Sequence, residues 1–463
     1  MDYFYHITVF LLFLTKKYLM KRILFSITAL LISSAAFSQY WSTQNSGFAA
    51  ASRGISGMEM YDANTIWAFA YNGVTTTANV QEFTKTSNGG TTWTAGTINV
   101  GNTALRITNI SGVSATTAWV GAFDNTNGLG GIWKTSDGGT TWTNQLMLTT
   151  AGQSWTNYVH FFDANNGIIG GDPESGEFEI YTTSNGGTTW TRVPGANIPN
   201  PLTDEYGYNG GYYAVGNNIF FYTGKGRIYK STDKGLTWTV LATNSIIGDF
   251  GGTTESGDMA WSDSNTGIIV RKTFTGTTPT GLQFHKTTDG GATWSQITYT
   301  GLTAANNISD ITYVPGTDIL LAVSSSNTNG GSWKSKNGTK WTAIDTGVQH
   351  LSVRCSDVNT CFSGGFNTSA TVGGMFKSTQ VLATSEAVNA AKQTIIYPNP
   401  TKGEINIKTD QKIKMISVVD MSGKTVIKTD SGKTDLSSLP KGTYIIKAEL
   451  SNGTAATEKV IKQ

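Results

Sequence analysis

Short apolar runs separated by polar turns fill most of the chain between residues 39 and 380. A typical run is aromatic or aliphatic and ends in Lys or Thr, as in GGIWKT and GRIYKS, and a Gly-rich segment follows it. Such runs, bounded by Gly, Asn, Asp and Ser, are typical of β-strands joined by tight turns. Two hairpins recur about every 48 residues, so each recurrence is expected to supply four strands.

One turn motif marks these repeats, with the pattern [ST]-x-[DN]-x-G-x-T-W, which we call the box. Its full copies carry Asn88 and Trp93, Asp137 and Trp142, Asn185 and Trp190, Asp233 and Trp238, and Asp289 and Trp294. A shorter copy, SKNGTKW, carries Asn337 and Trp341, and the six tryptophans are 49, 48, 48, 56 and 47 residues apart. We expect the Asp or Asn to accept backbone N–H bonds, the Gly to permit a positive φ, and the Trp ring to pack between neighbouring repeats.

Seven repeats are predicted from their first strands. These strands are expected near Ser56, Thr108, Tyr158, Tyr208, Asp258, Ser309 and Leu351. The seventh repeat lacks a box and a fourth strand, whereas QYWSTQNSG, which starts at residue 39, resembles the strands that follow boxes. Pairing the first strand with the last repeat would close the ring and remove exposed sheet edges. The sequence thus predicts an all-β protein whose residues 39–380 form a seven-bladed β-propeller closed by residues 39–46.

The boxes resemble the Asp-box (BNR) repeats of sialidases, of xyloglucanase-type glycoside hydrolases and of photosystem II assembly factors of the Ycf48 class. The resemblance covers residues 39–380, and the segment GGDPESGEFEIYTTSNGG is similar to one in secreted bacterial Ycf48-like propellers. It implies the fold, but one scaffold hosts unrelated sites, so it selects no single function.

The carboxy-terminal residues are expected to form a separate module. After a small, polar linker at 381–390, residues 391–463 alternate apolar and polar positions between Gly, Pro and Asp turns, which predicts a small β-sandwich. Its landmarks are Tyr397, Pro398, Asn399 and Pro400, then Asp420 and Gly423, then Leu439, Gly442 and Tyr444. This order closely resembles the sorting domain of type IX (Por) secretion cargo. The resemblance implies handling by the type IX machinery, removal of the tail, and an extracellular or outer-surface location; an ordinary adhesive sandwich is the alternative.

Residues 1–38 are predicted to be a leader. A basic pair at 21 and 22 precedes the apolar residues 23–32, and small residues at 36 and 38 precede Gln39, as in a secretory signal peptide. Met20 is the expected start. An uncleaved anchor is the alternative, but each apolar run is shorter than the ~20 residues that span a bilayer, so no transmembrane segment is expected in the mature chain.

Two cysteines, Cys355 and Cys361, flank the turn-like segment SDVNT. A hairpin there would place both thiols on facing strands, so we expect a disulfide, with two unpaired core thiols as the alternative. An exported protein matures where disulfides persist. Closing so short a loop would stabilise the fold by roughly 2 kcal/mol.

Charge and motif content exclude several functions. Charged residues make up only 14% of the chain, and residues 39–380 carry 17 basic and 22 acidic side chains, which argues against a nucleic-acid partner. We find no phosphate-binding loop, metal-ligand cluster or nucleophile elbow, so we expect no cofactor and no metal. Of the mature histidines, His285 occupies a position that is aromatic in other repeats and is expected to pack, while His160 and His350 lack catalytic context.

Ligands are expected to meet the face formed by the loops between second and third strands and by the links between repeats, which we call the loop face. Its charged candidates are Arg53, Arg106, Asp172, Glu174, Glu177, Glu205, Lys225, Arg227, Asp249, Arg271, Lys272 and His350. Tyr206 and Trp155 are candidate stacking platforms. Ordinary solvated loop charge is the alternative for each.

Three functions are weighed against the sequence: ligand binding, glycoside hydrolysis and a role in assembly. A sialidase would need an amino-terminal arginine motif that is missing here, where the nearest arginine is Arg53. Another glycosidase would need two carboxylates ~5 to 9.5 Å apart, and the candidates are Asp172, Glu174, Glu177, Asp249 and Asp258. Xyloglucanase-type enzymes also place their substrate between two propellers, and only one is predicted here.

We therefore expect a secreted or surface-attached propeller, without a recognisable catalytic set, that binds a protein or glycan through the loop face. The alternatives are an extracellular glycoside hydrolase and a Ycf48-like assembly factor, which predicts an arginine patch of Arg53, Arg106 and Arg354.

Overall fold

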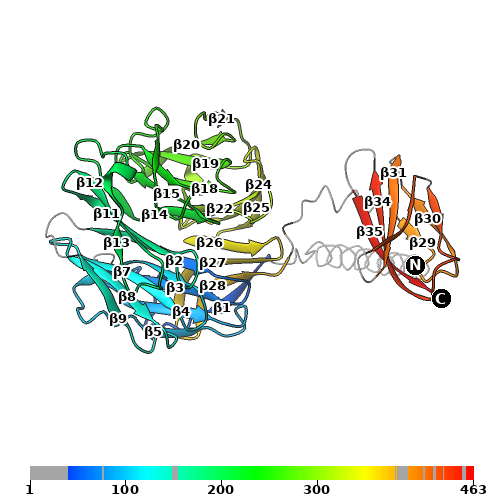
Figure 1. Cartoon of the computed structure of the whole chain (residues 1–463), viewed down its shortest axis with the longest axis horizontal. Coiled ribbons are helices and arrows are strands. Elements are labelled where there is room, and N and C mark those ends of the chain that lie inside the picture. Colours follow the sequence, from blue (N-terminus) through cyan, green and yellow to red (C-terminus); the bar gives the residue numbers. More distant parts are fainter. Residues whose placement is uncertain are drawn as a thin grey trace, which may run out of the picture. The chain divides into compact units, whose positions relative to one another are not determined.

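The computed structural model describes residues 40–75, 78–148, 155–380, 382, 395–409, 412–420, 424–430, 432–450 and 455–463. The predicted leader, and the linker apart from Leu382, lie outside the described residues. The chain forms two compact units that divide between residues 380 and 381. Each unit is nearly all β (Figure 1).

The first unit is a β-propeller of four-stranded antiparallel sets. Five sets are separate sheets. The first two sheets hold β6 (Leu105–Gly112), β7 (Ala118–Asp124), β8 (Gly130–Thr135) and β9 (Thr143–Leu148), and β10 (Thr156–Phe161), β11 (Gly167–Glu174), β12 (Glu177–Thr183) and β13 (Thr191–Arg192). The next three hold β14 (Gly207–Val215), β15 (Asn218–Thr223), β16 (Ile228–Ser231) and β17 (Thr239–Leu241); β18 (Glu255–Trp261), β19 (Gly267–Thr275), β20 (Thr278–Thr287) and β21 (Ser295–Ile297); and β22 (Ile308–Tyr313), β23 (Ile319–Ser324), β24 (Gly331–Lys336) and β25 (Lys340–Thr346). An eight-stranded sheet contains two more sets: β26 (Ser352–Asp357), β27 (Thr360–Ser369), β28 (Val372–Ser378) and β1 (Trp41–Asn45), and then β2 (Arg53–Met60), β3 (Ile66–Asn72), β4 (Glu82–Thr86) and β5 (Thr94–Thr97). These two sets are joined by one pairing, Gly54 with Phe366.

The second strand of a set is buried and the fourth is largely exposed. β7 reads AWVGAFD and β23 reads ILLAVS, and almost every side chain in both is buried, whereas β5 is exposed or half-buried. A continuous apolar run suits a strand that is covered on both faces, here by neighbouring sheets. The sequence therefore sets the radial order of the strands.

The innermost strands contact one another in a ring. β2, β6, β10, β14, β18, β22 and β26 touch in that order, and β26 touches β2. At the junction of the last and first sets, Lys377 Nζ donates to the Gly89 carbonyl at 2.6 Å. These contacts fit the seven repeats predicted from the sequence.

The amino-terminal strand pairs with the last set. β1 lies antiparallel to β28, with Thr43 opposite Phe376, which is the pairing expected for residues 39–46. The Trp41 side chain is 1% exposed, and its Nε1 donates to Ser332 Oγ at 2.7 Å. Ser332 in turn donates to Asp345, whose other carboxylate oxygen lies 2.9 Å from His350 Nε2. This network ties β1 to the neighbouring set of β22–β25 and to His350, which precedes β26.

The full boxes have the expected geometry. Asp137 accepts from the Thr141 N–H at 2.9 Å and from the Thr141 hydroxyl at 2.6 Å, and Gly139 has φ +89°. These hydrogen bonds lower the pKa of Asp137 to about 2. The Trp142 ring packs edge-on against Trp67 and Phe83 of the preceding set.

The short box departs from the prediction at Asn337. Asn337 has φ +67°, and its N–H donates to the Asp318 carbonyl at 3.2 Å. In a full box these are the properties of the first glycine: Gly138 has φ +79° and donates to Thr116. Asn337 therefore stands at the position of the first glycine and not at that of Asp137. The short box has one residue fewer than a full box, and Asn tolerates the left-handed backbone conformation that this position needs.

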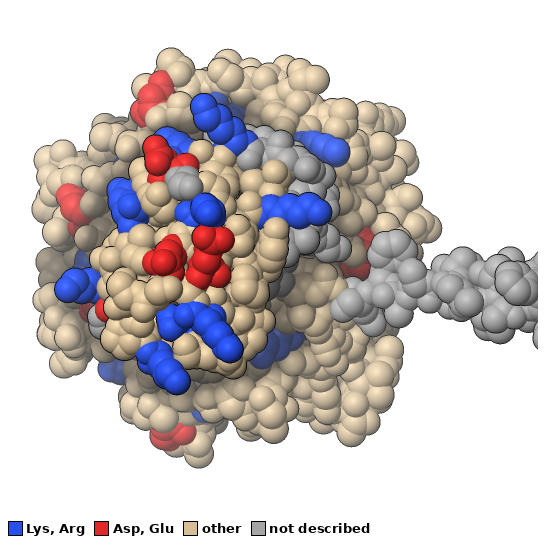
Figure 2. All heavy atoms as spheres, turned by 90° about the vertical axis from the view of Figure 1, so that its right-hand side faces the viewer, with Lys and Arg blue, Asp and Glu red and all other residues tan. Residues whose placement is uncertain are grey.

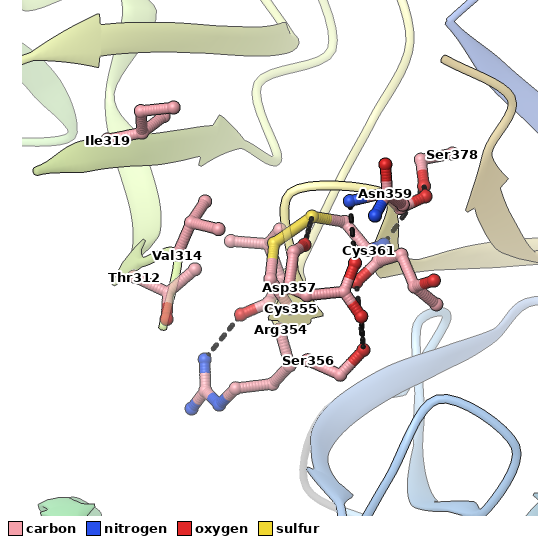
Figure 3. Close-up of a disulfide and its surroundings, with 12 residues drawn as sticks. Thr312, Val314, Ile319, Arg354, Cys355, Ser356, Asp357, Asn359, Cys361 and Ser378 are labelled. Carbon is pink, nitrogen blue, oxygen red and sulfur yellow. Dashed lines mark hydrogen bonds between the residues drawn. A yellow bond between two sulfur atoms is a disulfide. The ribbon is translucent and has the colours of Figure 1, made fainter. Parts of the chain in front are cut away.

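Cys355 and Cys361 form a disulfide, which confirms that prediction. The two residues lie opposite one another on β26 and β27, with their Cα atoms 4.0 Å apart (Figure 3). The bond is local and joins the two strands of one hairpin.

The second unit is a β-sandwich. One sheet holds β29 (Ile395–Tyr397), β30 (Glu404–Lys408) and β33 (Lys433–Asp435), and the other holds β32 (Thr425–Thr429), β31 (Ile413–Asp420), β34 (Gly442–Leu450) and β35 (Ala455–Lys462). Both sheets contribute to one apolar core.

The sorting landmarks lie at the ends of these strands. Asn399 bonds to the Lys459 carbonyl at 2.7 Å and to the Ile461 N–H at 3.0 Å, and Tyr444 donates to the Pro440 carbonyl at 2.8 Å. Leu439 packs against the core, and Gly442 begins β34. Asp420 ends β31, and Gly423 lies outside the described residues. The landmarks thus hold turns and termini of the sandwich.

Candidate binding site on the loop face

Several charged candidates are paired with side chains that the sequence did not reveal. The pairs are Arg53 with Glu82 at 2.8 Å, Glu174 with Arg192 at 2.8 Å, Arg271 with Glu255 at 2.9 Å, and His350 with Asp345 at 2.9 Å. Lys272 donates to the Ile308 carbonyl at 2.7 Å. His350 is fully buried and therefore packs within the fold. In Figure 2, which faces the right-hand side of Figure 1 and not the loop face in particular, basic and acidic groups are interspersed among uncharged residues.

Five other candidates gather around residues 202–208, which we call the platform loop: Asp172, Glu205, Tyr206, Arg227 and Asp249. The platform loop is the end of the link between β13 and β14 together with the first two residues of β14. Glu205 is 4% exposed and forms an ion pair with Arg227, which follows the turn between β15 and β16. Burial would raise the pKa of Glu205, but hydrogen bonds from Arg227, the Thr223 hydroxyl and the Leu202 N–H outweigh it and lower the pKa. An ionised Glu205 therefore holds the platform loop against the next set.

Asp172 fixes the end of the same loop. Its Oδ1 accepts from Asn157 Nδ2 at 2.7 Å and from the Gly207 N–H at 2.8 Å. Burial raises the pKa of Asp172 to about 6, against the opposing effect of these hydrogen bonds. Asp172 is thus a positioning residue, and its carboxylate is engaged with the protein.

Four side chains of the platform loop are exposed: Leu202 and Tyr206, and the polar Thr203 and Asp204. Tyr206 is 42% exposed and Leu202 is 49% exposed. The Tyr206 ring lies over Gly224, where a Cβ would approach it to 2.8 Å, and it meets the Tyr208 ring edge-on at 5.4 Å. Tyr208 donates its hydroxyl to Asp249. Three buried or hydrogen-bonded carboxylates therefore hold one exposed tyrosine in place.

The remaining candidates stand apart from this loop. Arg106 is exposed and lines a separate cavity of about 370 Å³ beside β2 and β3. Trp155 packs edge-on against Phe123 at 5.3 Å, so its ring is only partly available. Glu177 and Lys225 are half-buried.

The arginine patch expected of an assembly factor is largely neutralised. Arg53 is paired as described, and Arg354 lies 2.8 Å from Asp310. Arg106 alone of the three is exposed.

Sequence reasoning missed a cavity on the propeller axis. It has a volume of about 600 Å³ and is lined by residues of all seven innermost strands, among them Glu59, Asp258, Asp310 and Arg354. From the sequence, Asp258 is expected only near the start of a first strand and as one of five candidate glycosidase carboxylates. A polar residue at the same place in several first strands is the signal that could have identified this cavity.

Comparisons with known proteins agree with the two units. Residues 395–463 match the family described as a secretion system C-terminal sorting domain. This match confirms the predicted tail and indicates export by the type IX system to the cell surface or the medium. No curated protein sequence matches the chain.

Solved structures show the fold of the first unit. A Ycf48 protein bound to D1 peptide has a TM-score of 0.50 at 12% identity over 74% of this chain and 98% of that chain. Ycf48 from Cyanidioschyzon merolae has 0.47 at 14% over 73% and 98%, and a GH74 xyloglucanase from Xanthomonas campestris has 0.48 at 12% over 88% and 59%. At such identities the first likeness shows a β-propeller fold. No helix in the described part of the chain is long and apolar enough to cross a membrane.

Proposed function

We propose that this protein is an exported β-propeller that binds a protein or glycan through the platform loop. The observation that carries the proposal is an exposed aromatic and aliphatic pair, Tyr206 and Leu202, on a loop whose backbone is held by buried polar groups. Tyr206 offers a ring face and a hydroxyl together, which suits both a sugar ring and a protein side chain. Because Glu205 and Asp172 already fix the loop, little conformational entropy would be lost on binding.

The test is a binding measurement on the exported mature protein with matched tyrosine variants. We expect glycan-array screening or a pull-down from the cell envelope to identify a ligand, and Tyr206→Ala to weaken its affinity at least tenfold. Tyr61→Ala is the control, since Tyr61 is 54% exposed in the turn between β2 and β3, away from the loop face. Equal affinities of Tyr206→Ala and the parent would reject the proposed site.

An extracellular glycoside hydrolase is a second candidate, favoured by one pair of carboxyl groups. Asp310 accepts from Arg354 at 2.8 Å and from the Val353 N–H at 2.9 Å. The pKa of Asp258, in the same cavity, is raised by burial and by the charge of Asp310. Glycoside hydrolysis divides the roles of proton donor and carboxylate between two such groups, and the raised pKa suits Asp258 to the first role.

Hydrolysis is tested by reducing-sugar release from a panel of polysaccharides. If this candidate is right, the parent protein turns over at least one of them and Asp258→Asn abolishes the turnover. Turnover that survives in Asp258→Asn would exclude this pair as the catalytic one.

A further inference from the structure

The cavity on the propeller axis has the size and position of a ligand site independent of the platform loop. Its volume of about 600 Å³ falls inside the range of about 300–1,000 Å³ that small-molecule sites occupy. Residues from each innermost strand line it, so all seven first strands shape this one site. The Glu59 and Asp258 side chains are half-buried and face this space.

Acidic groups outnumber basic groups on the cavity wall. Glu59, Asp258 and Asp310 line it against a single guanidinium, that of Arg354. Arg354 is already committed to Asp310, with which it forms an ion pair at 2.8 Å. Burial raises the pKa of Glu59 to about 7 although Arg354 opposes the rise. Glu59 is thus a carboxyl group that the protein's own cations leave largely uncompensated.

Buried polar groups on the same wall lack partners among the described residues. His160 Nδ1, the Tyr313 hydroxyl and Ser352 Oγ are all in this state, and these residues are 8%, 3% and 3% exposed. A buried polar atom without a hydrogen bond costs about 1–3 kcal/mol, so the residues of this wall hold hydrogen-bonding capacity that the protein itself leaves unused. This observation is independent of the acidic surplus.

We propose that the axial cavity binds a small organic cation that carries a primary ammonium group, with Glu59 as its counter-ion. Carboxylates accept hydrogen bonds only, and an ammonium group donates three. Tyr212 and Tyr213 also line the cavity, next to its carboxyl groups. An anion would meet the acidic surplus, and within the described residues no three His, Cys, Asp or Glu side chains are placed to hold a metal ion.

Calorimetric titration of the exported mature chain tests this proposal with defined probes. Putrescine represents a free amine, N-acetyl-lysine amide represents a lysine side chain of a peptide, and butane-1,4-diol is the uncharged match of putrescine. We expect saturable binding of one or both amines and none of the diol. The amine that binds more tightly identifies the source of the ammonium group.

Substitutions then locate the bound cation. Glu59→Gln is expected to weaken the amine at least tenfold, while Glu404→Gln, which removes the same charge from the carboxy-terminal sandwich, leaves the affinity unchanged. Melting temperatures of both variants verify folding, and Tyr206→Ala should keep full amine affinity because the platform loop is a different site. Absence of amine binding, equal binding of the diol, an unchanged affinity in folded Glu59→Gln, or saturable Ca²⁺ binding that putrescine does not displace would overturn the proposal.

Discussion

Truncation of Trp41 directly tests whether β1 closes the ring by packing against the last set. The side chain is 1% exposed, meets Tyr40 edge-on at 4.9 Å and lies 5.5 Å from the His350 ring. Truncating a buried tryptophan to alanine costs about 3–5 kcal/mol. The lost Nε1 donor adds about 1 kcal/mol at most, because Ser332 keeps its bond to Asp345. At about 2 °C per kcal/mol for a large domain, Trp41→Ala should lower the melting temperature by about 6–12 °C.

The assay combines thermal unfolding with amide hydrogen exchange. Exchange should accelerate first in residues 41–45 and 374–378, which pair across β1 and β28. Trp41→Phe is the matched control, because it keeps an aromatic ring while it loses the donor and part of the indole volume, so it should lose less stability than Trp41→Ala. A melting temperature within 2 °C of the parent for Trp41→Ala, with β1 amides unprotected in the parent, would refute the docking of β1.

Three further predictions concern the disulfide, acid and export. Replacing Cys355 and Cys361 together with serine should lower stability by about 2 kcal/mol, measured by urea unfolding, and added reductant should then have no further effect. The pKa of Asp172 is raised to about 6, so its contribution to stability is complete below its ordinary value of 3.8 and is lost as the pH rises through 6. The pKa of Asp137 is lowered to about 2, so its contribution is present above 3.8 and is lost as the pH falls through 2. Asp172 should therefore contribute a rise in melting temperature from pH 7 to pH 5 and Asp137 a fall in strong acid, and Asp172→Asn should remove the first contribution. Deletion of residues 395–463 should leave the protein inside the cell envelope, and immunoblots of medium and cell fractions would contradict this if the truncated chain were released normally.

The boxes and the disulfide could be predicted because their contacts are local. Asp137 and Thr141 are four residues apart, and Cys355 and Cys361 are six apart, so the spacing alone brings them together. The same reasoning failed at Asn337. The short box keeps the residue types of the motif but is one residue shorter, so Asn337 takes the backbone conformation of a different motif position. Alignment of residue types could not show which residue adopts the left-handed backbone conformation.

The candidate site was predictable in its members but not in its grouping. Asp172 and Asp249 belong to different repeats, and each reaches the platform loop through contacts 35 or 41 residues away in the chain. Arg53 and Arg354 looked like free cations because their partners lie 29 and 44 residues away. Pairing across such separations depends on the register of each sheet.

The sequence by itself determined the repeat, the strand order within it and the export signal, because periodic apolar patterns and short motifs encode contacts between near neighbours. Tertiary structure decided which charges are neutralised, which tyrosine stays exposed and which side chains face the axis. Glu59 and Asp258 share one cavity only because the sheets curve into a ring, which brings first strands from distant repeats together.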